Sequence, residues 1–209
     1  MDCLITMEKI DLYKEQKELY SPSIKEPVMV DVPECQFIMI DGKGDPNTSK
    51  EYQNAIMALF SLSYTIKFLL KKGSEQVDYR VLPLEGLWWA PDMKNFGTSD
   101  KSDWLWTSMI RQPDFVTEAH FRIAIESVKK KKPELNLTNV RFEKFHEGKS
   151  AQIMYIGPFS GEGPTIKNIH EFIKASGFKL NGKHHEIYLS DIRKLDPSKW
   201  KTIIRQPYA

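Results

Sequence analysis

The longest periodic stretch of the chain has an apolar residue at every third or fourth position, from Tyr52 to Leu70. This spacing places the apolar side chains along one face of a helix, which begins at Thr48 or Ser49 and ends before Gly73. A mostly apolar strand precedes the helix, and two short strands separated by a proline follow it. The pattern therefore predicts the order strand, helix, strand, strand. These elements are expected at 36–40, 48–72, 79–82 and 84–89.

The same order returns in the last third of the chain. A helix begins near Pro164, where the missing N–H of proline is harmless in the first turn, and it ends at Ser176 and Gly177. One strand precedes this helix and two strands follow it, while a strand, a helix and another strand separate the two repeats. The second repeat has strands at 151–156, 186–189 and 202–205, and the intervening elements lie at 104–111, 115–132 and 140–146.

Two strand-helix-strand-strand modules predict an α+β fold with a pseudo-two-fold axis. Their strands would form one curved antiparallel sheet, with the helices on one face and a ligand cleft on the other. We expect one domain over 35–209, covered by a polar leader over 1–34. Module one spans about 35–111, an inserted helix and strand about 112–147, and module two about 148–209.

The composition is that of a globular protein and excludes several classes of function. The 209 residues are 41% hydrophobic and 28% charged, with 30 Lys and Arg against 28 Asp and Glu. This even balance argues against direct nucleic-acid binding, because the basic run Lys129–Lys132 only closes a predicted helix. The polar leader offers too little helical sequence for a helix-turn-helix unit. The lack of a signal sequence and of a long apolar run predicts a soluble cytoplasmic protein with no membrane partner.

No motif predicts a metal ion or a cofactor. The two cysteines, Cys3 and Cys35, have no CxxC spacing, so neither a disulfide framework nor a zinc site is expected. His184 and His185 alternate across one strand and cannot both face one metal ion. The chain also lacks a G-x-S-x-G nucleophile elbow and a Gly-Lys-Ser/Thr phosphate loop.

The strand near residue 186 carries the strongest candidate for chemistry, Glu186. Side chains alternate along a strand, so Glu186 shares a face with Tyr188, and we expect both to point into the cleft. Burial among aromatic rings would raise the pKa of Glu186. The alternative is an ordinary half-solvated strand with its polar side outward. The cleft-facing set is His184, Glu186, Tyr188 and Ser190, and the set expected beneath the helices is His185, Ile187 and Leu189.

Four of the five tryptophans lie between residues 88 and 106. Trp88 and Trp89 are adjacent, so one of them faces away from the helices, whereas Trp104 and Trp106 share a face. A sheet covered on one side has a limited core, so we expect the surplus rings to line a pocket. The alternative is a tryptophan-rich core. Tyr155 would supply a phenol from the second module, or else be a core tyrosine with a satisfied hydroxyl.

Three segments occur in the order Pro83-Leu84-Glu85-Gly86-Leu87-Trp88-Trp89, Tyr155-Ile156-Gly157-Pro158-Phe159 and Glu186-Ile187-Tyr188-Leu189-Ser190-Asp191. Together they resemble the GyrI-like small-molecule-binding domain family over roughly residues 35–209. The resemblance implies two strand-helix-strand-strand modules around a pseudo-dyad cleft. In multidrug-sensing regulators of this family, a buried glutamate that matches Glu186 binds aromatic, often cationic, compounds. Stand-alone members include hydrolases of cyclopropanoid DNA-alkylating genotoxins. The segment 91–136 departs from the family pattern.

The resemblance implies two alternative functions. In a detoxifying hydrolase, the tryptophans would stack on a flat substrate while Glu186 assists the attack of water on the cyclopropane. Tyr155 or Tyr188 would then donate a hydrogen bond to the substrate carbonyl oxygen. In a non-catalytic multidrug-type protein, the same carboxylate would bind or sequester a ligand cation, alone or with a transcriptional regulator. The expected substrate contacts are Trp88, Trp89, Trp104, Trp106 and Tyr188.

Overall fold

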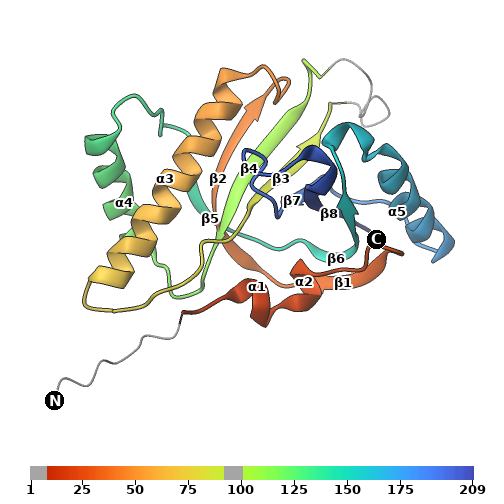
Figure 1. Cartoon of the computed structure of the whole chain (residues 1–209), viewed down its shortest axis with the longest axis horizontal. Coiled ribbons are helices and arrows are strands. Elements are labelled where there is room, and N and C mark those ends of the chain that lie inside the picture. Colours follow the sequence, from red (N-terminus) through yellow and green to blue (C-terminus); the bar gives the residue numbers. More distant parts are fainter. Residues whose placement is uncertain (1–8, 92–100) are drawn as a thin grey trace.

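The computed structural model describes residues 9–91 and 101–209. Within these residues, eight antiparallel strands form one curled sheet in the order β1-β6-β8-β7-β3-β4-β2-β5, accompanied by five α-helices (Figure 1). The strands are β1 (Val28–Val32), β2 (Cys35–Lys43), β3 (Leu84–Trp89), β4 (Leu105–Gln112), β5 (Arg141–Phe145), β6 (Gly148–Ile156), β7 (His184–Tyr188) and β8 (Lys201–Pro207). The helices are α1 (Leu12–Glu15), α2 (Lys17–Tyr20), α3 (Lys50–Lys72), α4 (Glu118–Lys131) and α5 (Gly163–Ala175).

Two strand-helix-strand-strand units are present, and the predicted α+β fold is confirmed. The first unit is β2, α3, β3 and β4, and the second is β6, α5, β7 and β8. The units meet at the centre of the sheet, where β3 pairs with β7 and Gly86 lies opposite Glu186. Helix α4 and strand β5 lie between the units in sequence, and β5 extends the sheet by pairing with β2.

The strand expected at 79–82 does not form, and β4 is the third strand of the first unit instead. Both sides of β3 are occupied, by β4 and β7, so no position beside it remains for another strand. Tyr79 makes an isolated parallel bridge with Ile10, and its side chain is buried in the core beneath α3. The turn-rich stretch expected at 91–103 lies mostly outside the described residues.

Helices α3 and α5 pack on the same face of the sheet. The hydroxyl oxygen of Ser49 accepts a hydrogen bond from the N–H of Tyr52 at 3.1 Å, which caps α3 where the pattern predicts. The apolar stripe of α3 then packs against β2 and β4 in a large buried cluster. Helix α5 contributes Ile169 and Ile173, which pack against Ile153 and Ile204 on β6 and β8.

Part of the opposite face is covered by residues 9–21, which we call the N-terminal strap. Its short helices α1 and α2 lie below the sheet in Figure 1, and Leu19 and Tyr20 pack against Ile187 and Ile203. The strap thus buries the side chains of β7 that the sequence placed beneath α3 and α5. Within residues 9–91 and 101–209, no helix combines the length and the apolar character that crossing a membrane requires.

A buried ionic network lies beneath the strap. Nδ1 of His185 is 2.9 Å from Oε1 of Glu147, and Nε2 of His185 is 3.0 Å from Oε2 of Glu85. Arg205 completes the network by donating to Oε2 of Glu147 at 3.0 Å. Burial alone would lower the pKa of His185, but the attraction and hydrogen bonds of Glu147 and Glu85 raise it to about 9. His185 therefore carries a positive charge at neutral pH.

Candidate functional site

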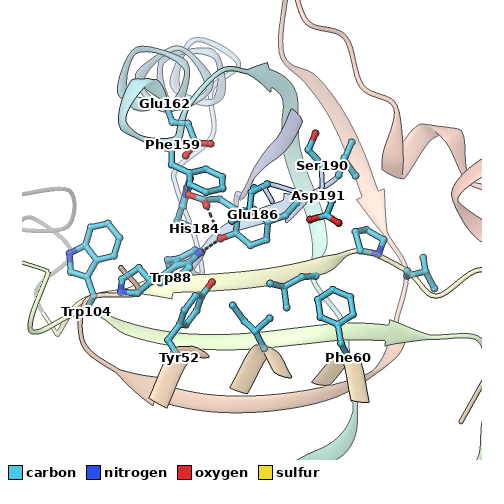
Figure 2. A pocket seen from close by; sticks show the side chains of 18 of the residues that line it. Tyr52, Phe60, Trp88, Trp104, Phe159, Glu162, His184, Glu186, Ser190 and Asp191 are labelled. Carbon is cyan, nitrogen blue, oxygen red and sulfur yellow. Dashed lines mark hydrogen bonds and ion pairs between the residues drawn. The ribbon is translucent and has the colours of Figure 1, made fainter. Parts of the chain in front are cut away.

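An open cleft of about 2070 Å³ runs between α3 and α5, and β3 and β7 form its floor (Figure 2). Tyr52 and Phe60 line it from α3. Phe159 and Glu162 line it from the turn that precedes α5, and Glu186 rises from the floor between the two walls. Aromatic and apolar side chains share the lining with many polar and charged ones, and His184, Glu186 and Tyr188 converge on the floor.

The cleft lies on the helix-bearing face of the sheet, so the expected position on the opposite face is wrong. Glu186 is opposite Ile204 in the β7–β8 ladder, and Ile204 packs against α5. Strand alternation correctly grouped Glu186 with His184, Tyr188 and Ser190, which all line the cleft. It could not say which face the helices cover. The N-terminal strap covers the other face beneath β7 and β8, and the cleft lies between α3 and α5.

Two hydrogen bonds hold the Glu186 carboxylate on the floor of the cleft. Nε2 of His184 lies 3.0 Å from Oε1, and the Tyr188 hydroxyl donates to Oε2 at 2.8 Å. Burial alone would raise the pKa of Glu186, but the hydrogen bonds from His184 and Tyr188 to the charged form lower it. The raised pKa expected from the sequence is therefore wrong, and Glu186 is ionised at neutral pH.

Trp88 extends this hydrogen-bonded chain across the floor. Its Nε1–H donates to the Tyr188 oxygen at 2.9 Å, so the Tyr188 hydroxyl both accepts from Trp88 and donates to Glu186. Gly86 makes room for this contact. A Cβ atom on Gly86 would lie 2.7 Å from Nε1 of Trp88 and 3.1 Å from the Tyr188 oxygen. The glycine in β3 therefore leaves space for both rings above the floor.

Glu162 is a second cleft carboxyl group, which the sequence analysis missed. It is only 4% exposed, and within the described part of the chain its buried Oε1 finds no hydrogen-bond partner. Burial, followed by repulsion from the Glu186 carboxylate, raises the pKa of Glu162 to about 9. The two carboxyl groups thus have opposite protonation states at neutral pH. The sequence showed only an acid within a Gly-rich turn, with no sign of its burial.

The structure separates the four clustered tryptophans. Trp88 and Trp104 line the cleft, with ring centroids 5.9 Å apart in an edge-to-face arrangement. Trp106 is fully buried in the α3 core, where a Cβ atom on Gly42 would lie 2.2 Å from its ring. Trp89 lies on the opposite face with Nζ of Lys183 3.4 Å from its ring centroid. Trp89 and Trp106 therefore do not line the cleft.

Tyr155 also lies outside the cleft lining. Its hydroxyl donates to the carbonyl oxygen of Pro158 at 3.0 Å, and its ring packs against the α5 core cluster. Tyr52 and Phe159, which were not predicted as ligand contacts, add to the aromatic lining of Trp88, Trp104 and Tyr188. Tyr52 lies 5.6 Å from the Trp88 ring, and Phe159 lies 5.6 Å from the Tyr188 ring. Periodicity placed Tyr52 on the inner face of α3 without indicating that the ring reaches the cleft.

Among the described residues, no group of three or more His, Cys, Asp or Glu side chains is arranged to hold a metal ion.

This fold and cleft correspond to a known family. The model of the GyrI-like small molecule binding domain matches residues 25–209. The chain belongs to this GyrI-like family. A comparison with curated proteins found no match. The family assignment identifies a small-molecule-binding domain.

Several solved structures resemble this GyrI-like chain. An uncharacterized conserved protein from Listeria innocua is 45% identical, with a TM-score of 0.89 over 96% of this chain and 100% of that one. A hydrolase from the same organism is 43% identical, with a TM-score of 0.87 over 97% of this chain and 100% of that one. The EcmrR C-terminal domain is 14% identical, with a TM-score of 0.54 over 88% of this chain and 97% of that one, and shares the fold alone.

Proposed function

We propose that this GyrI-like protein binds flat aromatic molecules in the cleft and hydrolyses cyclopropanoid DNA-alkylating genotoxins. The observation that carries the proposal is the placement of two largely buried carboxyl groups in one cleft, Glu186 on the floor and Glu162 on the turn before α5. The lowered pKa of Glu186 and the raised pKa of Glu162 support it. Such a pair can act as base and acid in one reaction. The similar hydrolases from Listeria innocua favour a hydrolytic activity without naming its substrate.

The proposed reaction adds one water molecule across a strained carbon–carbon bond. Glu186 orients the water and accepts one of its protons, while the water oxygen forms a bond to the cyclopropane methylene carbon. The bond between that carbon and the dienone ring breaks, and its electron pair moves into the ring. Glu162 donates its proton to the carbonyl oxygen, which becomes a phenol. A proton then passes from Glu186 to Glu162 and restores both groups.

Ring strain and aromatisation drive this opening, so the protein has to supply mainly orientation and proton transfer. Trp88, Trp104 and Tyr52 offer ring faces and edges on one side of Glu186, and Phe159 offers another from the α5 side. Tyr188 is less suited to protonate the substrate, because its hydroxyl proton is already directed to Glu186 at 2.8 Å. Glu162 replaces the tyrosines as the proposed proton donor.

A second candidate is non-catalytic binding of aromatic cations. The lowered pKa of Glu186 favours it, since a buried negative charge among aromatic rings attracts a delocalised cation. In that case Glu162 would stay protonated beside the ligand, and the protein would sequester compounds without changing them.

The deciding experiment incubates the purified protein with a cyclopropane-dienone alkylator and follows the product by mass spectrometry. Hydrolysis yields the ligand plus one water, with more than one product molecule formed per protein. We expect Glu186→Gln to reduce the rate about 100-fold or more, and Glu162→Gln to reduce it by a similar order. The control is Glu118→Gln, an exposed glutamate on α4 that pairs with Arg122 and lies outside the cleft lining. Recovery of unchanged ligand bound to the wild-type protein would refute hydrolysis and support sequestration.

A further inference from the structure

The turn between β6 and α5 lies closely against the hydroxyl group of Tyr155, whose side chain is half-buried. The Tyr155 hydroxyl donates to the carbonyl oxygen of Pro158 at 3.0 Å. The same oxygen accepts the backbone N–H of Gly161 at 2.8 Å. One carbonyl group therefore joins the side chain at the end of β6 to the short turn that leads into α5.

Two glycines allow the turn to wrap closely around this hydroxyl. A Cβ atom on Gly157 would lie 2.5 Å from the Tyr155 oxygen, and a Cβ atom on Gly161 would lie 2.4 Å from it. Gly157 also has a φ of +149°, which side-chain-bearing residues rarely adopt. Any larger residue at either position would push the turn away from the phenol.

The same turn presents two residues to the cleft, Phe159 and Glu162 (Figure 2). Phe159 packs edge-to-face on Tyr188 at 5.6 Å, so the turn faces the floor around Glu186. Glu162 follows Gly161 directly in the chain, and its N–H donates to the Phe159 carbonyl at 3.3 Å. The position of the Glu162 carboxyl group therefore depends on a turn that contacts the Tyr155 hydroxyl.

We propose that Tyr155 is a positioning residue, whose hydroxyl fixes the β6–α5 turn and so holds Glu162 buried opposite Glu186 without touching the ligand. A catalytic role for Glu162 in this place rests on the proposed function, but the placement of Glu162 by Tyr155 does not. Loss of the hydroxyl would loosen the turn, admit water to Glu162 and move it from Glu186. Each of these changes lowers the pKa of Glu162 toward the ordinary value of a glutamate.

The test measures the Glu162 pKa in the ligand-free protein, by NMR titration of ¹³C-labelled glutamate carboxyl groups. The wild-type protein should titrate near pH 9 at this residue. Tyr155→Phe should lower the value by about one unit or more. Tyr208→Phe is the control, because Tyr208 packs on Phe178 in the same half of the protein. An unchanged Glu162 pKa in Tyr155→Phe would overturn the proposal.

A double-mutant cycle tests the close contact itself. Gly161→Ala places a Cβ atom against the Tyr155 oxygen, but the next phenol atom, Cζ, is 3.6 Å from that Cβ position. Removing the oxygen should therefore relieve the clash. We expect Gly161→Ala to reduce the free energy of unfolding in the wild type and to have a smaller effect in Tyr155→Phe. If Gly161→Ala reduced the unfolding free energy equally in wild type and in Tyr155→Phe, the close contact between Gly161 and the Tyr155 oxygen would be contradicted.

Kinetics separate positioning from ligand contact. Tyr155→Phe should reduce kcat for cyclopropane opening by about tenfold and leave KM nearly unchanged, because only the reacting geometry is disturbed. A KM increase with unchanged kcat would mean that Tyr155 touches the ligand, and would overturn the proposal. If the pKa shifts as expected while the wild-type protein hydrolyses nothing, the positioning role stands and the proposed hydrolase function fails.

Discussion

Nε2 of His184 lies 3.0 Å from Oε1 of Glu186, and both side chains project from the same face of β7. This contact stabilises the charged form of Glu186 in a site where burial would otherwise favour the neutral form. His184 therefore helps to keep the Glu186 carboxylate charged, and a ligand or a water molecule in the cleft meets that charge.

Replacing this histidine should raise the pKa of Glu186. His184→Ala removes a hydrogen bond to the carboxylate, which should move the acidic limb of the pH–activity or pH–binding profile upward by about one unit. The profile is measured by product formation or, if no turnover occurs, by quenching of tryptophan fluorescence with an aromatic cation. His184→Gln retains an N–H donor and should restore part of the shift. An acidic limb that does not move would contradict the assigned role of His184.

Glu162 should make the folded protein less stable as the pH rises. Its folded pKa of about 9 exceeds the ordinary value of 4.5, so the folded state binds more protons than the unfolded state between these values. The free energy of unfolding therefore falls with rising pH in this window. Glu162→Gln should remove the contribution of Glu162 to the change of the unfolding free energy with pH, which is at most about 1.4 kcal/mol per pH unit. Urea unfolding measured from pH 6 to pH 9 checks this.

The Glu162 measurement needs a comparison with other titrating groups. His185 also has a raised folded pKa of about 9, so its stabilising charge is present below pH 6.5 and is lost toward pH 9. The contribution of His185 to the unfolding free energy is the same in wild type and in Glu162→Gln. It therefore cancels when the two pH dependences are subtracted. Glu171→Gln, which changes an exposed glutamate, should leave the slope as it is. Parallel pH slopes for wild type and Glu162→Gln would refute the raised pKa.

The ionic network beneath the N-terminal strap should be highly sensitive to substitution. Arg205 donates to Glu147 at 3.0 Å, to Gln152 at 2.8 Å and to the Leu19 carbonyl at 2.9 Å. Arg205→Met leaves Glu147 buried with one cation fewer, and should cost about 3–5 kcal/mol of unfolding free energy in urea denaturation.

A surface arginine provides the matched control for this network. Arg122 pairs with Glu118 on α4, where both side chains are exposed to solvent. Arg122→Met should change the unfolding free energy by less than about 1 kcal/mol. Similar losses for Arg205→Met and Arg122→Met would show that the buried network contributes nothing beyond an ordinary surface pair.

Gly86 should be needed for the shape of the cleft floor. In Gly86→Ala the new Cβ atom would stand 2.7 Å from Nε1 of Trp88, so the hydrogen bond from Trp88 to Tyr188 has to shift. We expect about tenfold weaker binding of an aromatic ligand by isothermal titration calorimetry. Gly163→Ala is the control, since a Cβ atom there meets no atom within 4 Å. Equal affinities for both variants would contradict the role of Gly86.

Local patterns predicted the elements that depend on neighbouring residues in the chain. The stripe from Tyr52 to Leu70 defined α3, and the alternation in β7 grouped Glu186 with Tyr188. The strand at 79–82 failed because pairing depends on which sheet positions are already filled, and β4 and β7 fill those beside β3. The residues of 79–82 alone do not indicate that other strands occupy the positions beside β3.

The sequence by itself determined the helices, most strands of the two repeated units and the side chains that share a face of each strand, because helix and strand periodicities are local properties. Only the tertiary structure decided that the strap covers part of one face and leaves the cleft on the other, between α3 and α5. It also brought Glu162 to Glu186 and gave the two carboxyl groups opposite protonation states. Those states follow from burial and from charges contributed by distant segments, which spacing along the chain does not encode.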